Sequence, residues 1–168
     1  MPTAAPVPQH SFLAAYSSRG AFTDCYSTSV PFAASLPLFV EAFYTTRLFR
    51  LERWLLAKLL KIESSDEQAY ELAQGVSSRF SAWKVEHRSS SEILLEAGQT
   101  RSWLSVVQAE GNEDETMLWF GSAVVPMRPG GKFGFAFHAL LGVHKLYSKL
   151  LLSAAARNLH AVRKRRVA

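Results

Sequence analysis

The sequence has a single cysteine, Cys25, and no apolar run long enough to cross a bilayer. One cysteine excludes a disulfide within the chain, which is usual for proteins of reducing compartments. Glu41, Arg47 and Arg50 interrupt the best candidate, so no stretch has the roughly 20 uncharged apolar residues of a spanning helix. The first nine residues lack the basic start and apolar middle of a signal peptide. We therefore expect a soluble, cytoplasmic protein.

The sequence also lacks the motifs of cofactor, metal and nucleophile sites. No GxGxxG or Walker-type loop follows a predicted strand. His138 and His144 are six residues apart, a poor spacing for zinc, and no cysteine pair supports them. Cys25 follows Asp24, whose charge disfavours the thiolate, so we interpret it as a packed thiol. We predict no metal and no cofactor, and we assign no catalytic residue.

Positive charge gathers at one end of the chain. The net charge is +5, and Arg163, Lys164, Arg165 and Arg166 supply four of these charges. The rest is close to neutral, so we expect no nucleic-acid partner. Four basic residues are too few for stable membrane attachment. We interpret residues 163–168 as a basic tail that opposes the negative end of a helix dipole.

The first thirty residues divide into two parts. Residues 1–20 contain three prolines and end in Ser-Ser-Arg-Gly, which predicts a flexible N-terminal arm. Residues 23–30 are rich in β-branched and aromatic residues, typical of a strand. This strand begins a single predicted domain over residues 21–162.

The next segment has helical spacing. Residues 36–62 carry leucines three and four positions apart and contain no glycine. Thr45 and Thr46 weaken the helical preference, which leaves open one long helix or two with a bend. A capping-box spacing from Ser64 to Glu67 predicts a further short helix that Gly75 ends.

The second half predicts a sheet followed by a long helix. Four segments of alternating polarity are joined by short turns, as in an antiparallel meander: residues 81–88, 92–97, 102–109 and 117–125. The last helix runs from Phe137 to about Val162, and its wide apolar face needs cover from the sheet before it. We therefore predict an α+β, helix-grip fold. A curved antiparallel sheet wraps around this helix, and the other helices are inserted after the first strand.

This order of elements resembles that of the START, pollen-allergen and polyketide-cyclase-like (SRPBCC, helix-grip) superfamily. Within it, the residues resemble the uncharacterised bacterial family DUF2867. The matching segments are short hydrophobic patterns: Asp24-Cys25-Tyr26, residues 80–86, 92–95, 102–105 and 116–120, and Phe137-His138. The glycine-rich connection over residues 129–135 departs from the family pattern. The resemblance implies the fold and a cavity that often holds an apolar ligand, and it transfers no catalytic residue.

A cavity between sheet and helix would be lined by inward-facing side chains, although the sequence leaves open which strand face is inward. We assign to this lining a set of large apolar residues and a few polar ones: Trp83, Val85, Trp103, Val107, Trp119, Tyr147, Leu151, His138, His144 and Arg50. The alternative, that these side chains only fill a close-packed core, stays open.

The function expected first is binding of a small apolar or amphipathic molecule in this cavity. An enzyme of cyclase or isomerase type is a second hypothesis, favoured by a buried histidine that faces the cavity beside another polar group. A third is a partner-binding domain with a filled core and an exposed apolar patch on residues 36–62.

Overall fold

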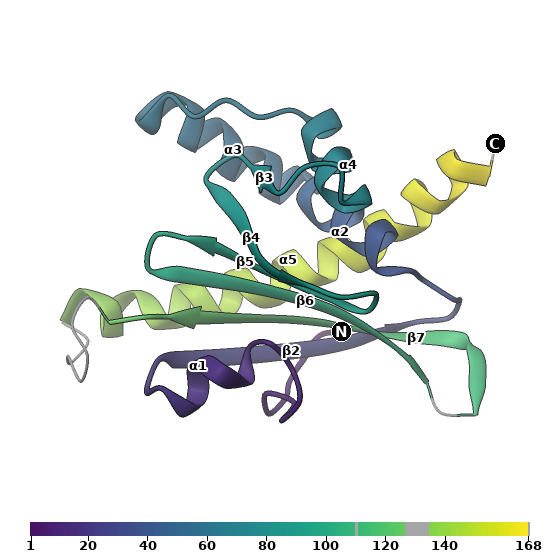
Figure 1. The fold of residues 1–168 in the computed structure, drawn as a ribbon, viewed down its shortest axis with the longest axis horizontal. Helices are drawn as coiled ribbons and strands as arrows, with labels where there is room; N and C mark the ends of the chain where they lie inside the picture. Colours follow the sequence, from purple (N-terminus) through teal and green to yellow (C-terminus); the bar gives the residue numbers. More distant parts are fainter. Residues whose placement is uncertain (110, 127–134, 168) are drawn as a thin grey trace.

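A curved seven-stranded antiparallel sheet forms the centre of the computed structural model, which describes residues 1–109, 111–126 and 135–167 (Figure 1). The strand order is β1-β2-β7-β6-β5-β4-β3. The strands are β1 (Thr3–Ala4), β2 (Phe22–Val30), β3 (Arg79–Phe80), β4 (Trp83–Arg88), β5 (Glu92–Ala97), β6 (Thr100–Ala109) and β7 (Asn112–Val124). β4 to β7 form the predicted meander, and β2 pairs with β7 along its whole length.

Five helices lie on the two faces of this sheet. They are α1 (Ala14–Ser18), α2 (Leu36–Tyr44), α3 (Arg47–Leu60), α4 (Asp66–Gln74) and α5 (Phe135–Val167). Figure 1 shows α1 on one side of the sheet and α2, α3 and α4 on the opposite side. The α+β fold class, the inserted helices and the long C-terminal helix against the sheet confirm the prediction.

The segment over residues 36–62 forms two helices, because two threonines break it. Thr45 ends α2, and its hydroxyl donates to the Glu41 carbonyl at 2.7 Å. Thr46 begins α3, and its Oγ1 accepts a hydrogen bond from the Phe49 N–H at 3.1 Å. The Thr46 side chain therefore satisfies a main-chain N–H that the start of α3 leaves free, and the Thr45 hydroxyl is a second donor to a carbonyl that already accepts from the Thr45 N–H.

The predicted cap of α4 is wrong by one residue. Ser65, with Gln68, forms the capping box, and Gly75 ends the helix in a left-handed conformation as predicted. Ser64 is held by α3 instead, because Arg53 donates from Nε to Ser64 Oγ and from Nη2 to the Ser64 carbonyl. These bonds fix α4 to α3.

The main core lies between the inner face of the sheet, α2 and α5. It contains side chains from all of these elements, among them Phe39, Phe43, Leu104, Phe120, Leu152 and Leu159. Three α5 residues that the sequence places on the apolar, covered face are exposed: Val143, Leu146 and Leu150, at 65, 60 and 50%. The sheet and α2 cover only one side of α5, and these residues lie on another.

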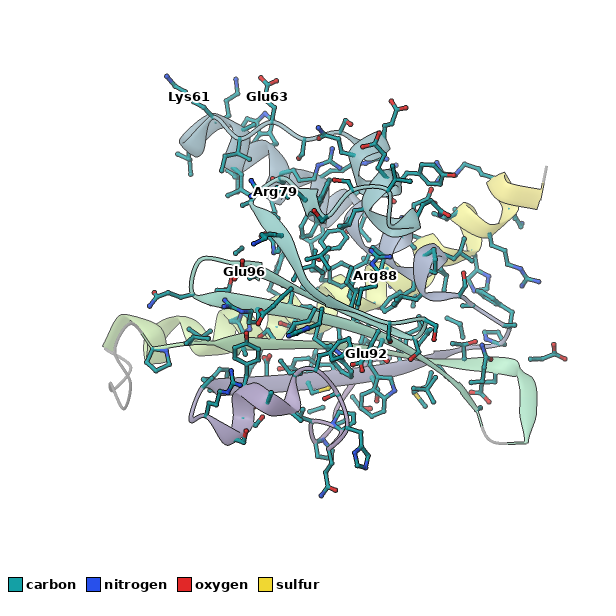
Figure 2. All side chains as sticks on the ribbon, in the orientation of Figure 1. Lys61, Glu63, Arg79, Arg88, Glu92 and Glu96 are labelled. Carbon is teal, nitrogen blue, oxygen red and sulfur yellow. The ribbon has the colours of Figure 1, made fainter. Side chains whose placement is uncertain are left out.

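Residues 1–20, which the sequence predicts to be a flexible arm, lie against the outer face of the sheet. β1 pairs with β2, and Leu13 and Tyr16 are buried in a second core with Cys25 and Trp103. The Phe12 N–H donates to Glu92 Oε2 at 3.1 Å, and Trp103 Nε1 donates to the same oxygen at 2.6 Å. Glu92 is labelled in Figure 2. The apolar residues that follow the prolines thus cover a sheet face that would otherwise be exposed.

Gly121 of β7 is the point of closest approach between this segment and the sheet. A methyl group there would lie 2.5 Å from Leu13 Cδ2 and 3.0 Å from the Asp24 carbonyl oxygen. We expect Gly121→Ala to lower the free energy of unfolding by about 1–3 kcal/mol, as overpacking does. Hydrogen exchange of residues 1–20 should become faster.

A double-mutant cycle with Leu13→Ala checks this cause, since removing the Leu13 side chain removes the nearest clash. Gly121→Ala should then cost less in the Leu13→Ala background than in the natural sequence. Equal costs in both backgrounds would show that the N-terminal segment is not what the methyl group displaces.

Candidate functional site

A cavity of about 180 Å³ lies between the inner face of the sheet, α3 and α5. Its walls are largely aromatic, and the side chains that line it include Phe43, Phe49, Trp83, Phe120 and Leu151. Its polar residues include Glu52 from α3, Ser122 from β7, and His144, Tyr147 and Ser148 from α5. An apolar enclosure with a few converging polar groups is the usual composition of a small-molecule site.

Two polar residues of this cavity, Ser122 and His144, form one connected cluster with Asp24 and Tyr26 of β2. Ser122 Oγ donates to Asp24 Oδ1 at 2.6 Å and lies 2.9 Å from His144 Nε2. His144 Nε2 also lies 3.4 Å from Asp24 Oδ2, and the Tyr26 hydroxyl donates to that oxygen at 3.2 Å. β2 and β7 supply Asp24 and Ser122 as directly paired residues, and α5 brings His144 to them.

The Asp24 carboxylate is buried but remains ionised. Burial by itself raises the pKa of Asp24, and the hydrogen bonds from His144 and Ser122 lower it by more, so the pKa lies below the usual range. The Asp24 carboxylate therefore faces α5 as a hydrogen-bond acceptor that is shielded from solvent. Its charge fixes His144 with a proton on Nε2, which points at Ser122 and Asp24.

This cluster is not arranged as a nucleophilic serine. In a catalytic triad, histidine takes the serine proton on one ring nitrogen while the carboxylate binds the other nitrogen. Here Ser122 gives its only proton to Asp24, and both Ser122 and Asp24 contact the same nitrogen, His144 Nε2. Ser122 is thus an oriented hydrogen-bonding group, and His144 is the residue of the cluster with acid–base capacity.

A second polar pair closes the cavity on the α3 side. The Tyr147 hydroxyl donates to Glu52 Oε2 and so joins α5 to α3. Burial raises the pKa of Glu52, which the Tyr147 hydrogen bond opposes. Burial and the neighbouring Glu52 charge also raise the pKa of Tyr147. At neutral pH the Tyr147 phenol therefore keeps its proton and shares it in a hydrogen bond with the Glu52 carboxyl group.

Ser148 is the one polar residue on the cavity wall whose hydroxyl is buried without a hydrogen-bond partner in the described structure. Its side chain is fully buried. A buried hydroxyl without a partner costs about 1–3 kcal/mol, so native proteins rarely keep one without a role. Its hydroxyl has almost no accessible surface, so a molecule in the cavity would reach it through a small shift of the wall.

The structure places at the cavity four of the ten residues that the sequence assigned to its lining: Trp83, His144, Tyr147 and Leu151. Val85 does not line the cavity; it is half-buried and packs against the main core. The interpretation of the C-terminal helix as one wall of the cavity rests on three of these residues.

Three assigned residues lie on the opposite face of the sheet. Trp103 is in the outer core and Trp119 packs against it, while Val107 is 52% exposed. Their alternation along the strands is as predicted, but their even-numbered neighbours Leu104 and Phe120 face inward. Trp103, Val107 and Trp119 instead border an open groove of about 590 Å³ next to residues 8–11.

The last two assigned residues are not at the cavity either. Arg50 lies on the surface of α3, forms an ion pair with Asp66, and borders a groove of about 680 Å³ between α3 and α5. His138 falls within α5, and its side chain lies outside the described residues, as does the 129–134 part of the glycine-rich connection.

Sequence reasoning missed Asp24, Ser122, Glu52 and Ser148 as site residues. Asp24 and His144 are 120 positions apart, so no local spacing joins them. The available signals were polar residues at inward positions: Asp24 alternates with the buried Cys25, and Glu52 is the only acidic residue in a basic and apolar helix. In the described ranges, no three His, Cys, Asp or Glu side chains converge as metal ligands would.

No helix among the described residues has the length and apolarity to span a bilayer.

No family model and no curated protein sequence matches this chain. Solved structures with some likeness are a protein of unknown function from Staphylococcus aureus (9% identity, TM-score 0.41, covering 86% of this chain and 98% of that one) and a conserved protein of unknown function from Enterococcus faecalis (11%, 0.39, 90% and 94%). A third is CalU16 from Micromonospora echinospora (11%, 0.33, 98% and 94%).

Proposed function

We propose that this protein binds a small apolar or amphipathic molecule, about the size of a single ring, in the cavity between the sheet and α5. No reaction is assigned. The observation that carries the proposal is the buried Ser148 hydroxyl, which has no partner in the described structure and lies on the wall of an aromatic-lined cavity. A volume of about 180 Å³ is close to that of an engineered apolar cavity of about 150 Å³ that admits benzene.

The sequence resemblance supports the same proposal. Members of the SRPBCC superfamily often hold apolar ligands between sheet and C-terminal helix, and the residues quoted above resemble DUF2867. We propose membership of that family on the sequence patterns alone. The cavity here is small, about 180 Å³, so a sterol or a long acyl chain exceeds its volume.

Phenol and toluene form a matched pair of probes, because they differ mainly in one hydroxyl. We expect phenol to bind more tightly, since it can hydrogen-bond Ser148. Ser148→Ala should weaken phenol binding about 2- to 10-fold, the worth of one hydrogen bond, and leave toluene binding unchanged. Calorimetric titration and the melting temperature measure both. Because Ser148→Ala removes a buried hydroxyl without a partner, it should also fold at least as stably as the natural sequence.

The outer groove supplies the control. Ser105 is buried there, on the other side of the sheet, and Ser105→Ala should change neither affinity. Failure of both probes to bind would refute the proposal, and loss of phenol binding in Ser105→Ala alone would move the site to the outer groove.

An isomerase-like reaction is a second candidate, because one specific observation favours it. His144 faces the cavity with Ser122 and Asp24 in hydrogen-bond reach, which is how a histidine is positioned for proton transfer. The test is exchange of the α-protons of cyclohexanone in deuterium oxide. Exchange above the rate in buffer that is lost in His144→Gln would support an enzyme, and exchange equal to that of buffer would exclude it for this probe.

A further inference from the structure

The exposed apolar residues of this protein are concentrated on two helices. Of the ten large hydrophobic residues that are exposed in the described structure, seven belong to α3 and α5: Leu51, Trp54, Leu55, Leu59, Val143, Leu146 and Leu150. Soluble monomers rarely leave so many large apolar side chains together on one surface, and such patches mark interaction sites.

The two sets of residues adjoin the same seam. Glu52 on α3 is bonded to Tyr147 on α5, and Leu48 and Leu150 border one groove between the helices. At 100° per residue, Leu48, Leu51, Leu55 and Leu59 form a stripe beside Glu52. Val143, Leu146 and Leu150 form a stripe beside Tyr147 in the same way. The two stripes therefore lie along the same seam between α3 and α5, and together they form what we call the α3–α5 strip, the apolar part of the α3–α5 face.

Basic residues flank this strip, and acidic residues are nearly absent from it. α3 and α5 carry eleven of the nineteen Lys and Arg residues but only one of the fourteen acidic residues, Glu52, which is bonded to Tyr147. The two helices thus have a formal charge of +10, and the rest of the chain has −5. Without the basic tail the net charge is close to zero, as the sequence total indicates, but the charges are segregated by element.

We propose that the α3–α5 face docks on the surface of a membrane that contains anionic lipids. The strip of leucines would enter the boundary between headgroups and acyl chains, and the flanking basic residues would contact the lipid phosphates. Trp54 lies at the edge of the strip beside Arg47 and Lys58, the position that tryptophan favours at a membrane interface. The helices lie on the membrane and do not cross it.

Charge complementarity selects this occupant over a second copy of the chain. A symmetric dimer through the α3–α5 face would bring the exposed Arg47 and Lys58 of two copies together, and like charges oppose such an association. An anionic bilayer offers both the negative charge and the apolar environment. This inference does not depend on what binds in the cavity.

The test is co-sedimentation of the full chain with vesicles of phosphatidylcholine alone and of phosphatidylcholine with phosphatidylglycerol. We expect binding only to the anionic vesicles, weaker at high salt, with a blue shift of tryptophan fluorescence that is lost in Trp54→Phe. Arg47→Gln with Lys58→Gln should weaken binding roughly 25-fold, about fivefold for each basic residue near the surface. Leu55→Ser with Leu59→Ser should weaken it by about tenfold or more.

Matched controls use residues of the same type elsewhere. Arg19→Gln with Lys84→Gln removes two exposed charges away from these helices, and Val107→Ser removes an exposed apolar residue on the outer face. Both should leave vesicle binding unchanged. Because all these positions are exposed, the variants should keep the natural melting temperature.

Three results would overturn the proposal. One is no binding to anionic vesicles, and another is equal loss of binding in the controls and in the α3–α5 variants. The third is a dimer in sedimentation velocity that Leu55→Ser with Leu59→Ser converts to a monomer, which would assign the face to a second copy.

Discussion

Replacing Phe43 by alanine is expected to lower the free energy of unfolding by about 3–5 kcal/mol, the usual cost of removing a buried aromatic side chain. The Phe43 ring lies between α2 and the sheet, with its centroid 4.9 Å from that of Phe120 and 5.2 Å from that of Tyr44. Its ring neighbours belong to different elements, so they cannot move together to fill the space that the Phe43 ring would leave. Since whole domains are stable by only about 5–15 kcal/mol, this variant should be close to unfolding.

Urea denaturation followed by tryptophan fluorescence measures this effect. Val107→Ala is the matched control, because Val107 is half-exposed on the outer face and surface changes usually stay within about 0.5 kcal/mol. A loss below about 1 kcal/mol in Phe43→Ala would mean that the cavity wall is loosely packed, and the ring-sized volume proposed for the ligand would then be wrong.

Asp24→Asn is expected to lower the free energy of unfolding at neutral pH by about 2–3 kcal/mol, because hydrogen bonds to a charged group are lost. Ser122, His144 and Tyr26 all contact this carboxylate. An amide cannot accept from all of them, and its own N–H₂ group faces donors.

The pH dependence of this difference has a definite sign. The pKa of Asp24 is lower in the folded state than its unfolded value near about 3.9. Its stabilising contribution is therefore complete above that value and is lost as the pH falls through the folded pKa. The gap between the natural sequence and Asp24→Asn should be constant near neutrality and should shrink in acid.

Glu52 changes the free energy of unfolding with pH in the direction opposite to Asp24. The pH dependence of one protein therefore mixes the two effects, and variants must be compared. The raised pKa of Glu52 means that its protonated form favours the fold, and this contribution decreases as the pH rises through the folded pKa. Urea denaturation at a series of pH values, with Glu52→Gln as the control, separates the two carboxyls. A gap for Asp24→Asn that widens in acid would show that the carboxylate is not held by these donors.

Local patterns predicted the elements of this fold well. Alternation of polarity identified β4 to β7, and the two threonines marked the place of a bend, although the sequence left open whether one helix or two cross it. Gly75 marked the end of α4 because glycine adopts the left-handed conformation found there without strain. These features depend on neighbours in sequence, which is why the sequence alone was sufficient for them.

Features that depend on which surfaces meet were not predicted. The strands containing Trp103 and Trp119 alternate as expected, but nothing local determines which of their two faces the helices cover. The prolines before Leu13 predicted a free arm, whereas the exposed outer face of the sheet gave that segment a place to bury its apolar residues. Shifting the inward face by one residue moves every side chain of a strand to the other side.

The candidate site shows the same division. Tyr147 and Leu151 were found because they lie on one side of a recognisable helix. Asp24 was overlooked because its partner His144 comes from another element, and Ser148 because an unpaired hydroxyl is visible only once its surroundings are known. Sites assembled from three or more elements therefore need coordinates before their chemistry can be recognised.

The sheet ends at each side in a strand of only two residues, β1 and β3. An edge strand with a long row of free main-chain groups can template the addition of a further strand from another molecule. In the part of the chain that the structure describes, Thr3 and Ala4 occupy the middle of the free edge of β2, opposite Ser27 and Tyr26. The N-terminal residues therefore cover part of an edge that could otherwise add a strand from another molecule.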